Sequence, residues 1–313
     1  MKTKTVALKK RSEFTEFKLE MKRNGSLYLL VLPVIIFYII FAYTPMYGAL
    51  IAFKNYSVGK GFAASEWVGF THFKNFFSSP DCGRIIWNTI RINVTNLIFG
   101  FPMPIILALM LNEVWNNKFK KVTQTITYLP HFISVVVICA LIKDFVDKDG
   151  LITSFLSIFG LENTNMLNNK HLFTPIYVIS DIWQSVGWGS IIYLAALTGI
   201  DSQLYEAASL DGAGKWKQLL HVTIPGIAPT IIIMLILRIG SLLNLGYEKI
   251  ILLYNPLIYE TSDVISTYVY RLAFSGQQWS YTTAIGLFNS VINLILLISA
   301  NKISGIVGET SLW

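Results

Sequence analysis

Long runs without a charged residue alternate with short polar segments along most of this chain. A helix needs about 20 mostly apolar residues to cross the hydrocarbon core of a bilayer, and each run is close to that length. Four runs are uninterrupted: Ser26–Phe53, Ile92–Asn112, Val122–Ile142 and Ile182–Ile200. Two are less regular: Val222–Leu237, which Arg238 interrupts before apolar residues resume to Tyr247, and a run within Leu272–Asn301, where residues 275–283 are polar. The pattern predicts six transmembrane helices.

The composition agrees with this prediction. Hydrophobic residues make up 53% of the 313 positions and charged residues only 14%, with a mean hydropathy of +0.54. A soluble domain of this length carries more charge and less apolar surface. We therefore expect an all-α membrane protein that crosses the bilayer several times.

Basic residues are unevenly distributed between the two sides of this predicted bundle. With the N-terminus placed in the cytoplasm, the inner segments carry fourteen Lys and Arg and the outer loops carry eight. Because Lys and Arg are enriched in cytoplasmic loops, both termini are expected in the cytoplasm. The expected organisation is a basic tail (1–26), a six-helix domain (27–303) with a cytoplasmic loop (199–225), and a C-terminal tail (304–313).

The net charge of +7 does not indicate a nucleic-acid partner. Eight of the 25 basic residues lie within residues 1–26, directly before a membrane span. Attraction to anionic membrane lipid explains a basic cluster at that position.

The predicted cytoplasmic loop has the pattern of a short helical hairpin. Asp201 and Ser202 are good N-caps for a first helix, and Asp211-Gly212-Ala213-Gly214 ends it in a turn. Residues 215–223 then read as a second helix that ends where Pro225 opens the next span. Small side chains along the hairpin allow another protein surface to approach the backbone closely. An ordinary helical loop is the alternative interpretation.

The spacing within this loop resembles a family signature. Glu-Ala-Ala, three residues, Gly, nine residues, then aliphatic-X-aliphatic-Pro is typical of the membrane subunits of binding-protein-dependent ABC importers, and it is matched here by Glu206, Ala207, Ala208, Gly212, Val222, Ile224 and Pro225. Tyr43-Thr44-Pro45-Met46-Tyr47-Gly48 and Trp87-Asn88-Thr89 are similar to the carbohydrate-uptake branch, and within it to permeases for oligosaccharides or polysaccharide fragments.

The resemblance implies a type I ABC importer permease fold in the bacterial cytoplasmic membrane and a set of partners. These are a second homologous permease that forms a heterodimer, two copies of an ABC ATPase that bind ATP and Mg, and an extracytoplasmic solute-binding lipoprotein that delivers an oligosaccharide. It also implies ATPase-coupling roles for Glu206, Ala207, Ala208, Asp211, Gly212, Gly214 and Pro225. The chain itself is then not an enzyme and needs no cofactor.

Polar residues inside predicted spans are candidates for a substrate pathway, because hydrocarbon penalises unpaired polar groups. The fourth and fifth spans contain most of them: Asp181, Trp183, Gln184, Trp188, Arg238, Ser241, Asn244, Tyr247 and Glu248. Gln184 and Trp188 share one helical face, and Arg238, Ser241 and Glu248 are expected to form a second polar stripe. A pairing of Arg238 with Asp181 or Glu248 that only packs the bundle is the alternative, and Asn93, Asn96, Asn289 and Asn293 are weaker candidates.

Other functional classes find less support. The segment Gly214-Lys215-Trp216 lacks the earlier glycine of a phosphate-binding loop, so the chain is not expected to be the motor. An ion-coupled secondary transporter or channel remains the alternative function, although such proteins typically carry paired acids and only Asp181 is an intramembrane acid. No carboxylate pair, activated nucleophile or metal-ligand spacing is evident among the histidines and the two cysteines.

Overall fold

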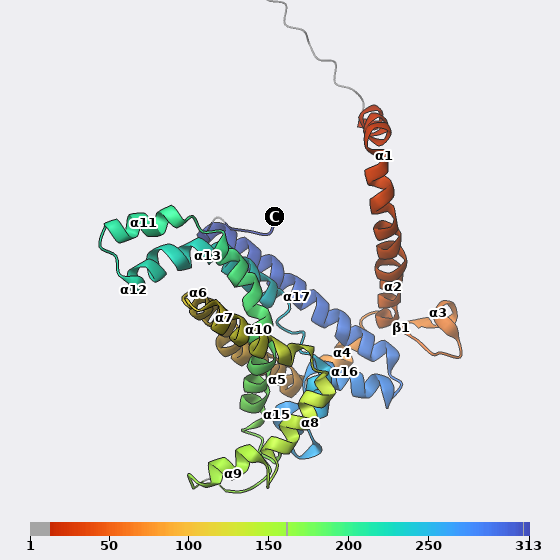
Figure 1. The fold of residues 1–313 in the computed structure, drawn as a ribbon. Coiled ribbons are helices and arrows are strands. Elements are labelled where there is room, and N and C mark those ends of the chain that lie inside the picture. The colour runs from red at the N-terminus through yellow and green to blue at the C-terminus, as the bar shows by residue number, and fades with distance from the viewer. Residues whose placement is uncertain (1–12, 161, 309) are drawn as a thin grey trace, which may run out of the picture.

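A computed structural model describes residues 13–160, 162–308 and 310–313, and Figure 1 shows their path. The first twelve residues of the predicted basic tail lie outside this described part. Almost all regular structure is helical. The longer helices are α1 (Glu13–Tyr38), α5 (Cys82–Gly100), α6 (Pro102–Asn112), α7 (Asn117–Tyr128), α8 (Val135–Val146), α10 (Phe173–Thr198), α13 (Ile224–Gly240), α16 (Ile265–Phe274) and α17 (Trp279–Gly308).

Short elements connect these helices. The short α-helices are α2 (Thr44–Met46), α3 (Gly61–Ala64), α4 (Thr71–Phe77), α9 (Leu151–Ser157), α11 (Ser202–Leu210), α12 (Lys215–Gln218), α14 (Tyr247–Leu253) and α15 (Tyr259–Ser262). The 3-10 segments are η2 (Tyr47–Phe53), η3 (Leu129–Phe132), η4 (Met166–Asn168) and η6 (Pro256–Ile258), and the π-helical segments are η1 (Ile39–Tyr43) and η5 (Leu219–Thr223). Strands β1 (Lys54–Asn55) and β2 (Glu66–Trp67) form one antiparallel pair.

Helix α10 lies at the centre of the bundle, in contact with α5, α6, α7 and α13. Tyr177 and Tyr193 of this helix are buried. At Gly187, a Cβ would collide with the carbonyl oxygen of Thr127, so only glycine lets α7 cross α10 this closely. Ile138, Phe173 and Ile250 are fully buried and join α8 and α14 to the same core. Apolar packing on α10 therefore organises the molecule.

Length and hydropathy confirm only some of the six predicted spans. Among the described residues, four helical segments are long and apolar enough to cross a membrane: Met21–Phe53, Cys82–Asn112, Lys215–Gly240 and Trp279–Ile306. A fifth would be the pair Asn117–Phe132 and Val135–Ser157, which is bent by 101°. Asp181 and Gln184 lower the mean hydropathy of α10, which lies where the fourth span was predicted.

The third predicted span, Val122–Ile142, is therefore not one straight helix. Pro130 lies in η3, and Ile133 and Ser134 have extended backbones. Proline has no N–H to donate to the preceding turn, and the extended residues then redirect the chain into α8.

The fifth predicted span also ends early. α13 stops at Gly240 rather than resuming to Tyr247, and α14 begins separately at Tyr247. The side-chain oxygen of Asn293 in α17 accepts a hydrogen bond from the backbone N–H of Leu243 at 3.0 Å. A partner outside the helix thus satisfies the backbone after the break, and Arg238, Ser241 and Glu248 do not form one stripe.

The second helix of the hairpin is longer than predicted, because it continues into the span. α12, η5 and α13 run without a break past Pro225. The N–H of Ile224 bonds to the carbonyl of Leu219, five residues back, instead of four. This π-turn moves the backbone away from the proline ring, which an α-turn at that point would crowd.

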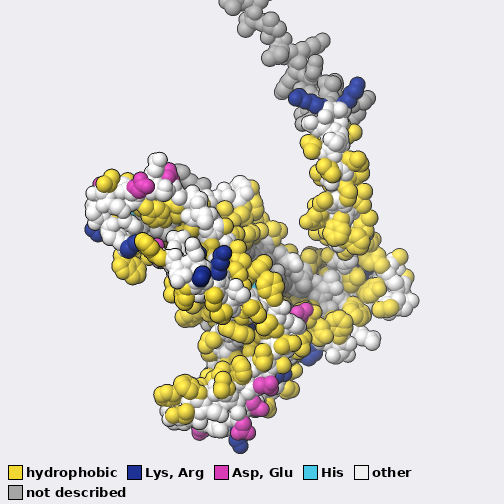
Figure 2. All heavy atoms as spheres, in the orientation of Figure 1, with side chains coloured by type: hydrophobic (Ala, Val, Ile, Leu, Met, Phe, Trp, Pro, Cys, Tyr) yellow, Lys and Arg dark blue, Asp and Glu magenta, His cyan; other side chains and the backbone are white. Residues whose placement is uncertain are grey.

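Helix α1 stands apart from the rest of the bundle, as Figure 1 shows. None of the residues in its most apolar window is buried. Its continuation, η2, contacts α17, and this contact joins the helix to the bundle. In Figure 2 hydrophobic side chains cover the part of α1 nearer the bundle on the visible face. Such a surface requires contact with lipid or another apolar helix.

Candidate functional site

The predicted hairpin forms around a well-defined helix end. Asp201 caps α11, its side chain accepting from the N–H of Gln203 at 2.9 Å. At the other end the N–H of Gly212 bonds to the carbonyl of Ser209 and that of Ala213 to the carbonyl of Ala208. Gly212 has a φ of +74°. These features make a Schellman motif, which favours glycine at this position.

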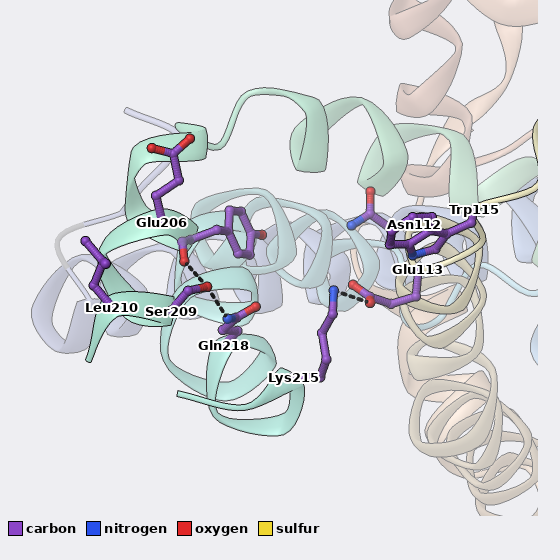
Figure 3. A pocket seen from close by; sticks show the side chains of 9 residues that line it. Asn112, Glu113, Trp115, Glu206, Ser209, Leu210, Lys215 and Gln218 are labelled. Atoms are coloured by element: carbon purple, nitrogen blue, oxygen red, sulfur yellow. Dashed lines mark hydrogen bonds and ion pairs between the residues drawn. The ribbon is translucent and has the colours of Figure 1, made fainter. Parts of the chain in front are cut away.

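Side-chain hydrogen bonds hold α11 and α12 together, as Figure 3 shows in part. The amide of Gln218 donates to the hydroxyl of Ser209 at 2.9 Å and to the carbonyl of Ala213 at 3.0 Å. The hydroxyl groups of Tyr205 and Thr223 lie 3.0 Å apart. These bonds join α11 to the first turns of the α12–α13 helix.

A groove of about 810 Å³ separates this hairpin from the end of α6. Lys215 forms an ion pair across it with Glu113 at 3.1 Å, and Glu206 lines it (Figure 3). Leu210 and Trp216 are 90% and 76% exposed, although both are large and apolar. An exposed apolar surface beside a groove is typical of a protein interface.

The predicted coupling residues lie together on this hairpin. Glu206, Ala207 and Ala208 are in α11, Asp211 and Gly212 in its C-terminal cap, and Gly214 caps α12. Pro225 is in the first turn of α13. Apart from Ala208, which is half-buried, these residues are exposed.

A second candidate site is a chamber of about 260 Å³ inside the bundle. Its lining brings together five of the predicted pathway residues: Asp181, Gln184, Arg238, Asn244 and Glu248. They come from α10, the last turn of α13, the following loop and α14. The break after Gly240 folds the chain back so that α14 faces α10, which the continuous helix of the prediction would not allow.

Four other predicted pathway residues lie outside the chamber lining. Trp183 lines an apolar groove of about 460 Å³ between α8 and α10. The ring of Trp188 stacks on His131 at 4.7 Å, and that of Tyr247 on Tyr270 at 5.1 Å. Ser241 donates to the carbonyl of Leu237. The chamber is therefore lined by amides and charges with Tyr177 as its one aromatic ring.

The main partner of Asp181 is a residue that the sequence reading missed. The ammonium group of Lys249 lies 3.5 Å from one carboxylate oxygen, and the amide of Asn96 donates to the other at 2.8 Å. The Lys249 side chain is 7% exposed and lies over the ring of Tyr177 at 5.3 Å. Lys249 lies just beyond Tyr247, where the fifth predicted span ends. The alternative pairings of Arg238 with Asp181 or Glu248 are not among the ion pairs of the described residues.

Arg238 also lines the chamber. Among the described residues, its guanidinium makes no ion pair. Asn244 accepts hydrogen bonds from Asn289 at 2.9 Å and Asn293 at 3.0 Å, so these two weaker candidates support the chamber wall. Asn93 and Asn96 line it directly. A guanidinium without a carboxylate partner can bind an anionic ligand in two-point fashion.

No metal site accompanies either candidate site. Within residues 13–160, 162–308 and 310–313, no group of three His, Cys, Asp or Glu side chains could hold a metal ion.

Comparison with known proteins gives consistent matches over most of the chain. Residues 100–305 match the family described as "Binding-protein-dependent transport system inner membrane component". Protein LplB of Bacillus subtilis is 45% identical, with 91% of this chain and 90% of that protein covered. The polygalacturonan/rhamnogalacturonan transport system permease protein YteP of the same organism is 43% identical, with 92% and 90% covered.

Solved structures are also similar. A bacterial ABC transporter that imports the acidic polysaccharide alginate contains a chain with a TM-score of 0.85 and 43% identity, covering 94% of this chain and 99% of that one. The alginate transporter in complex with a periplasmic protein bound to an alginate pentasaccharide has the same TM-score and 44% identity, with 94% and 98% covered.

Proposed function

The chain belongs to the family of binding-protein-dependent transport system inner membrane components, and from that premise we propose that it conducts an acidic oligosaccharide through the Asp181–Lys249 chamber. It is the permease subunit of a carbohydrate ABC importer, with a type I fold. The cargo is proposed to carry uronic acid units. Alginate and polygalacturonan consist of such units, and they appear in the names of similar proteins that are 43–44% identical to this chain.

The observation that carries this proposal is Arg238. Arg238 lines the chamber, and its guanidinium has no carboxylate partner among the described residues. Lys249 is paired with Asp181, and Glu248, which also lines the chamber, makes no ion pair with Arg238. A sugar carboxylate would complete the pairing of Arg238, and the chamber amides would bind hydroxyl groups.

The α11–α12 hairpin is proposed as the contact with the ATPase. Glu206 would meet a basic residue of that subunit, while Ala207, Ala208 and Gly214 allow close approach and Asp211 and Gly212 end α11. Two copies of the ATPase would bind ATP and Mg. Because the hairpin is joined to α13 without a break, its movement would reach Arg238 at the other end of α13.

A second permease is proposed to complete the pathway. The uncovered apolar surface of α1 supports this, since it buries little against the rest of its own chain. A different but related subunit is expected, in a heterodimer. An extracytoplasmic solute-binding lipoprotein would deliver the cargo, and both termini and the hairpin would then lie in the cytoplasm.

Uptake by the whole assembly tests the cargo and the role of Arg238. Proteoliposomes that contain this chain, the second permease, the ATPase and the loaded binding protein should take up an alginate pentasaccharide only with ATP and Mg. Arg238→Gln should lower that uptake about tenfold or more, because a charge-assisted contact contributes about 1.5–3 kcal/mol. Lys143→Gln, which removes a cation outside the chamber lining, is the matched control.

Two results would contradict the proposal. Equal loss of uptake for a neutral arabino-oligosaccharide and for the alginate pentasaccharide would exclude recognition of a carboxylate by Arg238. Uptake without ATP, driven by an ion gradient, would favour the secondary-transporter alternative.

A further inference from the structure

The end of the molecule opposite the hairpin contains a second polar recess. α17 has 30 residues and so extends about 45 Å at 1.5 Å per residue. Gly240, at the end of α13, packs against Leu297, and the first half of α17 continues beyond it, away from the hairpin (Figure 1). A recess of about 510 Å³ lies around the first turn of α17. It shares no lining residue with the chamber.

The recess combines side-chain amides with aromatic rings. The amides belong to Asn55, Asn75, Gln277 and Gln278, and the rings include those of Tyr56 and Trp279. None of its lining residues is Asp, Glu, Lys or Arg. Within the described part of the chain these four amides make no side-chain hydrogen bond. They are therefore available to a ligand, and the volume lies in the range of small-molecule sites.

Hydrogen bonds between distant segments build the walls of this recess. The backbone N–H of Tyr56 donates to the hydroxyl of Ser280, which is buried, at 2.9 Å. A ring nitrogen of His72 lies 3.0 Å from the carbonyl of Lys54 and donates to it. The β1–β2 and α4 segment is thereby attached to the start of α17, and the recess is formed without a ligand.

The backbone at Gln277 points to a specific requirement for its side chain. Gln277 has a φ of 49°, a value shared by no other non-glycine residue in the described part of the chain. Glycine would adopt this conformation without steric cost, whereas a residue with a Cβ is strained. Strain of this kind concentrates at binding sites. The amide is thus held at the recess despite an unfavourable backbone.

We propose that this recess is a carbohydrate subsite that binds one end of the oligosaccharide before the sugar enters the chamber. Amides donate to and accept from hydroxyl groups, and aromatic rings pack on the apolar faces of sugar rings. Because the lining has no charged residue, the subsite recognises hydroxyls and ring faces rather than carboxylates. The inference rests on the proposed function, since it adds an entry point to the same pathway.

Photolabelling tests the location. An alginate pentasaccharide with a diazirine at its reducing end is added, with the loaded binding protein, to the complete transporter in proteoliposomes. Labelled peptides that contain residues 55–56 or 277–281 are expected. Label confined to chamber peptides, with normal uptake, would overturn the subsite and leave the proposed function intact. Absence of uptake by the unaltered transporter would instead reject the proposed function.

Variants test the role of the side chain. Gln277→Gly removes the amide and relieves the backbone strain, so the melting temperature of the complex should stay equal or rise. Uptake at limiting sugar should fall about tenfold, the effect of losing about 1.4 kcal/mol of binding. The fall should be similar for the alginate pentasaccharide and a neutral arabino-oligosaccharide, unlike that for Arg238→Gln. Asn163→Ala, an exposed amide outside the recess lining, is the control and should leave uptake unchanged.

The recess could bind either the sugar or the solute-binding protein itself. Measuring how the empty solute-binding protein binds to the transporter distinguishes these two cases. If Gln277→Gly and Trp279→Ala weaken the binding of the empty protein as much as they reduce uptake, the recess contacts protein and the subsite is overturned. If they reduce uptake and photolabelling while the empty protein binds normally, the recess binds sugar.

Discussion

Gly212 and Gly214 lie two positions apart in one turn, but their backbones impose different requirements. Gly212 has a φ of +74°, while Gly214 has a φ of −68° that any residue can adopt. A Cβ at either position would meet no atom within 4 Å. Gly212 is therefore required for its conformation and not for lack of space.

Gly212→Ala should destabilise the hairpin by about 1 kcal/mol, because alanine is strained in the left-handed region. Sugar taken up per ATP hydrolysed should fall, since the C-terminal cap of α11 shifts, while membrane insertion remains normal. Gly214→Ala should leave the ratio of sugar taken up to ATP hydrolysed unchanged. The measurement is uptake and ATPase activity in the same proteoliposomes, and equal ratios for the two variants would contradict the role of the turn.

The ion pair of Lys249 and Asp181 makes a second prediction for single residues. Lys249→Met leaves the carboxylate of Asp181 in the chamber without its cation, and breaking a buried pair this way costs about 3 kcal/mol. Asp181→Asn combined with Lys249→Met removes both charges and should recover most of that loss. Thermal unfolding of the purified permease pair, analysed as a double-mutant cycle, gives the coupling. Additive effects would show that the pair is not coupled.

At the scale of elements, two π-turns occur in separate segments that share one sequence feature: a proline lies two positions after each. η1 ends before Thr44-Pro45 and η5 before Ile224-Pro225, and in each the residue before proline bonds to the carbonyl five residues back. The proline ring explains both. The turn at η5 joins the hairpin to α13, so it is placed where a local change of helical winding would alter the direction of the hairpin.

Pro225→Ala should let an ordinary α-turn form at residues 219–224. The free energy of local opening of this segment should then rise by about 1 kcal/mol. Slower hydrogen exchange in that segment is expected, together with less sugar transported per ATP. Pro229→Ala removes another proline from α13, downstream of the π-turn, and is the control. Unchanged coupling in Pro225→Ala with slower exchange would show that the π-turn only accommodates proline.

The sequence predicted those elements whose signals are local. The caps at Asp201 and Gly212 and the long apolar runs specify the hairpin and most helices, because capping and hydropathy act within a few turns. The break after Gly240 has a partner, Asn293, that lies far away in the sequence, whereas the break at Ile133 follows Pro130 in the same segment. For the same reason Lys249 could not be assigned to the chamber: its place depends on the break that folds α14 back. The candidate chamber was thus predicted in part and the outer recess was not predicted.

At the scale of the whole molecule, the exposed α1 sets a condition on the assembly. Ile35, Ile36 and Phe37 of this helix are 48%, 46% and 57% exposed, and the three side chains point in directions about 100° apart around a helix with 3.6 residues per turn. In a heterodimer at least one of these directions should face the second permease. A helix that contacted only lipid would not approach that subunit in any direction.

Benzoylphenylalanine placed in turn at Ile35, Ile36 and Phe37 should crosslink to the second permease on irradiation in native membranes, with a yield that depends on the position. Lipid contact alone would give no protein adduct, and adducts with a second copy of this chain would indicate a homodimer. The same probe at Ala284, which is fully buried in α17, should give no intersubunit product. A strong product at one α1 position together with a weak one at the next would define the face that the partner covers, because a mobile helix would label all three positions equally.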